Sequence, residues 1–199
     1  MVAHGFTYRS YPRVKHDVRK DILRPTVSFT IQLPGGEAWS EDALIDSGSP
    51  ACLFTHQVGE AIGVRFGRSG AEYENFEILG RREAAQMERV HVTLGHWPDL
   101  SWEMDAWFFL ETWDWKLQVG GIFGTEGFLT EWIVTFLRPF NMFVVASLDS
   151  IWRLERGPEG KPVVRAQAET QPQQLQTIDP LDPEEISPLL QYQEEWDVP

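Results

Sequence analysis

Apolar and polar residues alternate along the early part of the chain with the two-residue period of a half-buried strand. The clearest stretch covers residues 26 to 33. Its apolar face consists of Val27, Phe29, Ile31 and Leu33. The sequence Pro34-Gly35-Gly36 then predicts a turn, and a second strand is expected from about Glu41 to Asp46. The pattern therefore predicts two strands joined by a turn.

The middle of the chain shows the same pattern twice more. The first repeat has the apolar residues Val90, Val92 and Leu94, and residues 95 to 99 predict the turn that follows it. The next apolar face consists of Trp102, Met104, Ala106 and Phe108. Because Trp107 and Phe109 make the opposite face apolar too, this strand is expected to be buried on both sides or to face a partner.

One or two short helices are expected among these strands. Thr55 is a suitable N-cap for a helix that runs through Ile62, and Gly63 is a natural stop. A second short helix is expected over residues 128 to 131, before a strand that begins at Trp132. The sequence therefore predicts a mostly β fold.

Composition excludes several classes of function. The chain has 199 residues, of which 42% are hydrophobic, which suits one domain with a core. Its formal charge of -13 argues against nucleic acid or an anionic membrane as a partner. Cys52 is the single cysteine, so no intrachain disulfide is possible, and the N-terminus lacks a signal-peptide pattern; we expect a cytoplasmic protein. The apolar run from Trp132 to Val145 is interrupted and shorter than the roughly 20 residues of a membrane-spanning helix.

The two ends of the chain differ from its middle. Residues 1 to 20 carry five Lys and Arg against Asp17 alone, a net charge of +4. This segment is either an arm that docks on an acidic partner chain or a solvated, poorly ordered terminus. Residues 151 to 199 carry four Lys and Arg against ten acids and are rich in Pro and Gln, which predicts a disordered tail. Within it, residues 183 to 196 are a binding motif, an autoinhibitory peptide or plain tail. A folded domain is expected over residues 21 to 150.

A candidate site lies where the second predicted strand ends. The apolar residues 43 to 45 run directly into Asp46, Ser47, Gly48 and Ser49. A strand would hold the carboxylate of Asp46 on a rigid support at the start of a tight turn. An ordinary turn is the alternative interpretation, because Asp and Ser bond nearby amides and Gly allows a positive φ.

A second motif favours the chemical interpretation. Further along the chain come Ile122, Phe123 and Gly124, followed by the expected short helix and strand. An apolar strand that ends in Asp-Ser-Gly, with a later apolar-apolar-Gly element, resembles the retropepsin-like (retroviral-type) aspartic proteases. The resemblance covers roughly residues 21 to 148. It implies a closed antiparallel β-barrel of the acid-protease type.

The resemblance also implies an aspartic endopeptidase whose catalytic residue is Asp46. Such an enzyme needs two carboxylates that share one proton across a water. No other Asp of the chain lies in an Asp-(Ser/Thr)-Gly context, so a second copy is expected to supply the second carboxylate in a symmetric homodimer. The Ser47 hydroxyl would orient groups across the twofold axis, and Gly48 would let the two turns approach. The active-site turn implied also includes Ser49, and the supporting loop implied consists of Ile122, Phe123 and Gly124. The expected substrate is polypeptide, and neither a metal nor an organic cofactor is required.

Residues 72 to 89 occupy the position of the family's flap, a hairpin that closes over substrate. The flap candidates are Leu79, Gly80 and Arg81, with Gly80 near the tip. A simple surface hairpin is the alternative, and the segment lacks the glycine-rich tip that the family often shows.

One departure from the family favours a different function. The family often has an arginine after the second glycine, where it braces the active-site turn and the dimer contact, whereas this chain has Thr125 and Glu126. The competing hypothesis is a non-catalytic binding or assembly domain of the same fold. In such a protein Trp113 and Trp115 would serve as ligand platforms, although packing is the commoner fate of tryptophan.

A metal site beside Asp46 is not predicted. Cys52 and His56 lie close to it in sequence, but two potential ligands do not make a zinc site without further Cys or His at suitable spacing. We therefore expect Cys52 to be a small buried residue and His56 to lie on the surface of the helix.

Overall fold

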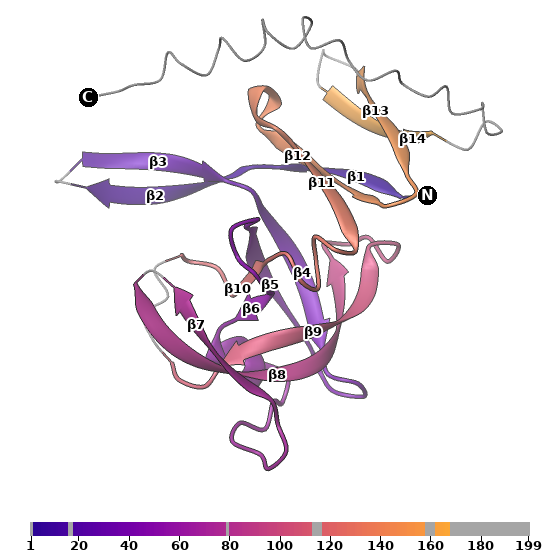
Figure 1. Cartoon of the computed structure of the whole chain (residues 1–199). Coiled ribbons are helices and arrows are strands. Elements are labelled where there is room, and N and C mark those ends of the chain that lie inside the picture. Colours follow the sequence, from indigo (N-terminus) through magenta and orange to yellow (C-terminus); the bar gives the residue numbers. More distant parts are fainter. Residues whose placement is uncertain (1, 16–17, 79, 113–116, 158–161, 168–199) are drawn as a thin grey trace, which may run out of the picture. The chain divides into compact units, whose positions relative to one another are not determined.

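Six strands close into a β-barrel (Figure 1). The computed structural model describes residues 2–15, 18–78, 80–112, 117–157 and 162–167. The order around the barrel is β4 (Thr26–Gln32), β5 (Ala38–Ile45), β10 (Gly121–Phe123), β6 (Leu53–Phe54), β9 (Ser101–Phe109) and β8 (Arg81–Leu94). Strand β8 pairs with β4 and closes the barrel. The β5–β10 and β6–β9 pairs are parallel and the others are antiparallel. The predicted closed, mostly antiparallel barrel is confirmed.

The apolar faces predicted from alternation fill this barrel. The buried residues of β4 and β8 include Val27, Phe29, Ile31, Val90, Val92 and Leu94. On β9, Phe108 stacks against Phe54 inside the barrel, with ring centroids 5.5 Å apart. Trp107 and Phe109 face the other way and pack in a second cluster with Phe76 of β7 (Tyr73–Ile78). The second half of β9, residues 106 to 109, is therefore buried on both sides, whereas Glu103 and Asp105 in its first half are exposed.

The one α-helix of the described residues is α1 (His56–Ala61). Thr55 is its N-cap, and the Thr55 hydroxyl accepts a hydrogen bond from the Val58 N–H at 3.4 Å. The C-cap is Ile62, and Gly63 follows with a φ of +86°, a conformation that suits glycine. The helix start and stop predicted from the sequence are confirmed.

The prediction of a second helix over residues 128 to 131 is wrong. Residues 125 to 131 form turns and one isolated bridge instead. Gly127, directly before this segment, has a φ of +89°, and its carbonyl accepts a hydrogen bond from Trp102 Nε1 at 2.7 Å. The tertiary contact with Trp102 therefore fixes a turn in a segment that is too short to form a helix by itself.

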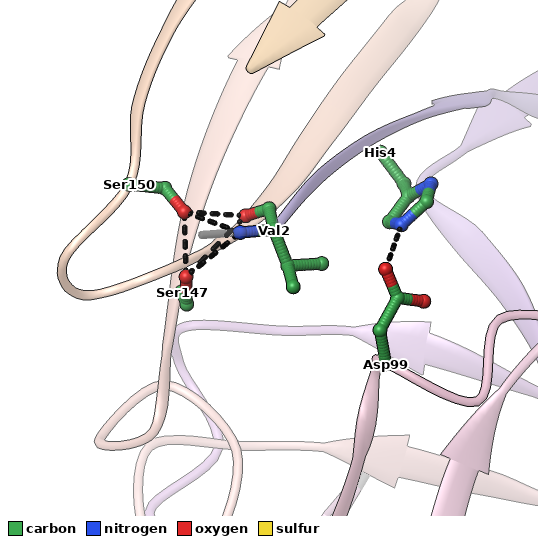
Figure 2. A network of polar contacts seen from close by, with 5 residues as sticks. All are labelled: Val2, His4, Asp99, Ser147 and Ser150. Atoms are coloured by element: carbon green, nitrogen blue, oxygen red, sulfur yellow. Dashed lines mark hydrogen bonds and ion pairs between the residues drawn. The ribbon is translucent and has the colours of Figure 1, made fainter. Parts of the chain in front are cut away.

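A three-stranded sheet contains the N-terminal strand. Its order is β1 (Ala3–Thr7), β12 (Met142–Ser147) and β11 (Trp132–Leu137), and the short 3-10 helix η1 (Arg138–Phe140) joins β11 to β12. Figure 2 shows how the start of β1 is fastened. The Val2 N–H is 2.7 Å from Ser150 Oγ, and His4 Nε2 lies 2.9 Å from Asp99 Oδ2. The hydrogen bond with His4 lowers the pKa of Asp99. The expectation of a poorly ordered terminus is therefore wrong for β1.

Further strands lie outside the expected domain limits of 21 and 150. Strands β2 (Arg9–Lys15) and β3 (Val18–Arg24) form an antiparallel ribbon, and β13 (Ile151–Arg156) pairs with β14 (Pro162–Gln167). Contacts group Met1–Gln167 into one compact unit, and a second unit, Ala168–Pro199, lies outside the described residues.

The disorder expected from residue 151 is thus wrong for β13 and β14. Trp152 and Leu154 alternate with charged residues along β13, and this strand pattern is hidden in the acidic, Pro-rich composition of the whole segment. Strand β14 also contacts β1, where the methyl groups of Val164 lie close to Gly5. The binding motif considered at residues 183 to 196 lies outside the described residues.

No helix in the part of the chain that the structure describes is both long and apolar enough to cross a membrane.

Candidate functional site

Strand β5 delivers Asp46 from a rigid support. This strand pairs with β4 on one side and with β10 on the other, and it ends at Ile45. The Asp46 N–H donates to the Phe123 carbonyl at 3.0 Å, and the Asp46 carbonyl accepts from the Ser49 N–H at 3.1 Å. The Gly48 N–H donates to Asp46 Oδ1 at 2.9 Å. The turn therefore orients the half-buried carboxylate through one oxygen.

The Gly124 motif lies against this turn. The Thr125 N–H donates to the Ser49 carbonyl at 2.9 Å, and the Glu126 N–H donates to the Pro50 carbonyl at 3.0 Å. A Cβ on Gly124 would lie 2.2 Å from the Ala51 carbonyl oxygen. Glycine is therefore required at this position by the close approach of two backbones. The structure brings the two sequence motifs together.

The residues of the turn differ in exposure. Ser49 is buried, and its hydroxyl donates to the Ala51 carbonyl at 2.8 Å, which holds the turn closed. Ser47 and Gly48 are exposed at the turn, while Ile122 and Phe123 are buried behind it. Ser47 and Gly48 are therefore accessible to a ligand or a second chain that approaches Asp46.

A cavity of about 230 Å³ opens beside the carboxylate. The turn lines it with Asp46, Gly48 and Ser49, and the end of β7 also contributes to the lining. The apolar lining includes Leu44, Leu53, Phe76, Ile78, Leu117 and Ile122, and Glu77 also contributes to it. Sequence reasoning missed Phe76, Ile78 and Leu117, although the alternation of Phe76 and Ile78 with Glu77 marks a strand with an apolar face. The cavity has room for one or two apolar side chains of a ligand.

The flap candidate is a β-hairpin formed by β7 and the start of β8. Ile78 pairs with Arg81, and Gly80 between them has a φ of +76°. Leu79 lies outside the described residues. Strand β7 of this hairpin lines the Asp46 cavity, whereas Gly80 and Arg81 are not among its lining residues. Trp113 and Trp115, the candidate ligand platforms, also lie outside the described residues.

Cys52 and His56 are not arranged as metal ligands. Cys52 Sγ donates to the Glu126 carbonyl at 3.2 Å, while the His56 ring stacks on Phe66 and its Nδ1 lies 3.0 Å from the Phe109 carbonyl. Only 16% of the His56 side chain is exposed, so its expected place on the helix surface is wrong. Across the described ranges, no group of three or more His, Cys, Asp and Glu could hold a metal ion.

Burial raises the pKa of the Cys52 thiol to about 12. Because the thiolate is the reactive form, we expect Cys52 in the native protein to react with a disulfide reagent far more slowly than a free thiol at pH near 8. Measurement of labelling against urea concentration should give a transition that coincides with unfolding by circular dichroism. Rapid labelling of the native protein would contradict the buried position of Cys52.

Comparison with known proteins adds no family to this description. No protein-family model matches the chain, and no curated protein matches it.

Proposed function

We propose that the protein is a retropepsin-like aspartic endopeptidase that acts as a homodimer. The observation that carries the proposal is the joint geometry of the two motifs. Asp46 directly follows strand β5, its backbone is bonded to Phe123, and it lines a cavity that strand β7 also lines. An ordinary surface turn has no need for the backbone contact at Gly124, where the nearest carbonyl leaves no room for a side chain.

The proposed mechanism uses one Asp46 from each copy. One carboxylate takes a proton from a water molecule, and the other, protonated, donates a hydrogen bond to the peptide carbonyl. Repulsion between the two close carboxylates keeps one of them protonated, so the optimum is expected at mildly acidic pH. The Gly48 N–H, which donates to Asp46 Oδ1, keeps the carboxylate oriented for this exchange. The chemistry needs neither metal nor organic cofactor.

The missing arginine after Gly124 has a partial substitute in this chain. The bonds from the Thr125 and Glu126 N–H groups to the Ser49 and Pro50 carbonyls brace the turn through backbone alone. Backbone bonds are independent of the side chains at these positions. The departure from the family pattern therefore weighs less against catalysis than the sequence suggests.

The experiment is digestion of a peptide library by the purified protein over a range of pH, with its association state measured in parallel. Cleavage beside apolar residues at mildly acidic pH is expected, because Leu44, Leu53 and Ile122 line the cavity. A pepstatin-type inhibitor should block cleavage and a chelator should not. A confirmed dimer that cleaves nothing across the pH range would instead favour the binding or assembly domain.

A further inference from the structure

The three-stranded sheet of the N-terminal strand has an unpaired edge. Strand β11 (Trp132–Leu137) pairs with β12 along its whole length, and no other strand of the described residues pairs with it. In an antiparallel pair only alternate residues bond to the partner strand, so the backbone N–H and C=O groups of the other residues point to the open side. Such a row of donors and acceptors is a template for one more strand.

This edge lacks the features that usually prevent strand addition. Folded proteins block their edge strands with charged residues, proline or a bulge. Strand β7, the edge strand of the barrel sheet, follows this rule, since it exposes Glu74 and Glu77. Strand β11 contains no charged residue and no proline, and its register with β12 runs without a bulge. The edge of β11 is therefore open to a further strand.

Two large apolar side chains are exposed along the same edge. Ile133 is 38% exposed and Phe136 is 44% exposed. The residues directly opposite them on β12, Ala146 and Phe143, are fully buried. The exposure of apolar surface is therefore confined to the outer strand and does not extend to the middle of the sheet. A strand added beside β11 would cover it.

The residues that flank β11 indicate which partner fits its edge. Glu131 precedes the strand and Arg138 follows it, and both are exposed. The Arg138 guanidinium lies over the Tyr8 ring, 4.9 Å from its centroid, and neither flanking residue has an ion pair in the part of the chain that the structure describes. If two copies of this strand pair antiparallel, the acidic start of each lies beside the basic end of the other. The edge is thus complementary to itself, and the uncharged strand between the flanks limits the repulsion between two chains that each carry -13.

We propose that β11 of one copy pairs antiparallel with β11 of a second copy, so that the two sheets become one continuous sheet across a twofold axis. In the register with Thr135 on the axis, Ile133 lies opposite Leu137 of the partner subunit, and Phe136 lies opposite Val134 of the partner subunit. Both exposed apolar side chains are then covered. The contact goes beyond the proposed protease and does not depend on catalysis. Because each copy contributes only one strand, we expect a dissociation constant on the order of micromolar.

Charges at position 135 test this pairing, because the axis places that position opposite its own copy. Thr135→Lys and Thr135→Glu each bring like charges together, so each variant alone should dissociate with a constant raised roughly tenfold or more. An equal mixture of the two should associate again, since a lysine then faces a glutamate across the axis. Analytical ultracentrifugation of the two variants and of their mixture measures these constants.

The same charges on another exposed hydroxyl residue are the matched control. Ser69 lies in the exposed turn before β7, and Ser69→Lys and Ser69→Glu should associate as the wild type does. Circular dichroism and thermal melting check that every variant folds.

A thiol at position 135 gives a second measurement that needs no charge. The single native cysteine, Cys52, is buried, so Thr135→Cys adds a thiol at the edge of β11 to a chain without another accessible one. Mild oxidation should join two copies through this position, because opposite Cβ atoms of an antiparallel pair lie within about 5.5 Å. Ser69→Cys, treated in the same way, should yield far less of the joined dimer.

Three results would overturn the proposal: a wild type that stays monomeric at about 100 µM, a Thr135→Lys variant that associates as the wild type does, or a mixture that remains dissociated. A monomeric wild type that binds an extended peptide of unrelated sequence at β11 would also overturn it. Association through β11 by a wild type that cleaves nothing would refute the protease and leave this inference standing. Cleavage by a protein whose Thr135→Lys variant associates unchanged would refute this inference and leave the protease standing.

Discussion

Alanine in place of Gly124 is expected to cost on the order of 3 kcal/mol or more of the free energy of unfolding. A Cβ at this position would lie 2.2 Å from the Ala51 carbonyl oxygen and 2.7 Å from that of Ser49. Both neighbours are backbone atoms, so no rotamer change relieves the clash. The loop must move away from the Asp46 turn, and this breaks the bonds from Thr125 and Glu126 that brace it.

Urea unfolding followed by circular dichroism measures this cost, with Gly36→Ala as the matched control. Gly36 lies in an exposed turn, and the nearest atom to its added Cβ would be Leu33 Cβ at 3.2 Å. The control should lose less than about 1 kcal/mol. If Gly124→Ala unfolds at the wild-type urea concentration, the two loops do not approach each other as described.

Asparagine in place of Asp46 is expected to abolish cleavage of polypeptide and to leave folding intact. Asn keeps the shape of Asp and its Oδ1 still accepts a hydrogen bond from the Gly48 N–H, so the turn is retained. The amide cannot take a proton from water or share one with its twin. Since both copies of a homodimer change together, the loss should approach completeness, as expected for removal of a general base rather than of a supporting group.

Glu77→Gln is the matched control for this substitution. Glu77 lines the same cavity from β7, and the change also converts a carboxylate to an amide. Cleavage should fall only modestly, because Glu77 lies on β7 and not on the turn that carries the proposed catalyst. Equal cleavage by wild type and Asp46→Asn would exclude Asp46 as the catalyst, and complete loss in Glu77→Gln would assign the second carboxylate to the same chain.

Local sequence patterns predicted the elements whose formation depends on residues close together in the chain. The alternation at Val27, Phe29 and Ile31 gave a barrel strand, and Thr55 with Gly63 marked the limits of α1, because strand faces and helix caps depend on neighbours within a few residues. The contact between the Asp46 turn and Gly124 could not be predicted from local patterns. Parallel pairing of β5 with β10 leaves no periodic trace, so only the order of the two motifs indicated it.

The elements that the sequence failed to predict depend on contacts between residues distant in sequence. A helix was expected over residues 128 to 131, but the segment forms turns, and Gly127 directly before it is hydrogen-bonded to Trp102. The N-terminal strand appeared to be a solvated arm because its partner, β12, lies at the other end of the folded unit. The contact of β14 with Gly5 also joins the two ends of the folded unit, so it could not be inferred from neighbouring residues. The net charge of residues 1 to 20 and of residues 151 to 199 follows from the sequence, but it carries no information on which strands β1 and β14 contact.

If one active site is built from two copies of the chain, mixing wild type with Asp46→Asn should inactivate the mixed dimers. An equal amount of the inactive variant, allowed to exchange subunits, should reduce the cleavage rate of a fixed amount of wild type to about half, because random pairing places half of the wild-type chains in inactive mixed dimers. Exchange is confirmed by a fluorescent tag on each form. A rate unchanged by the variant, with exchange complete, would contradict the shared dyad and place the whole site within one chain.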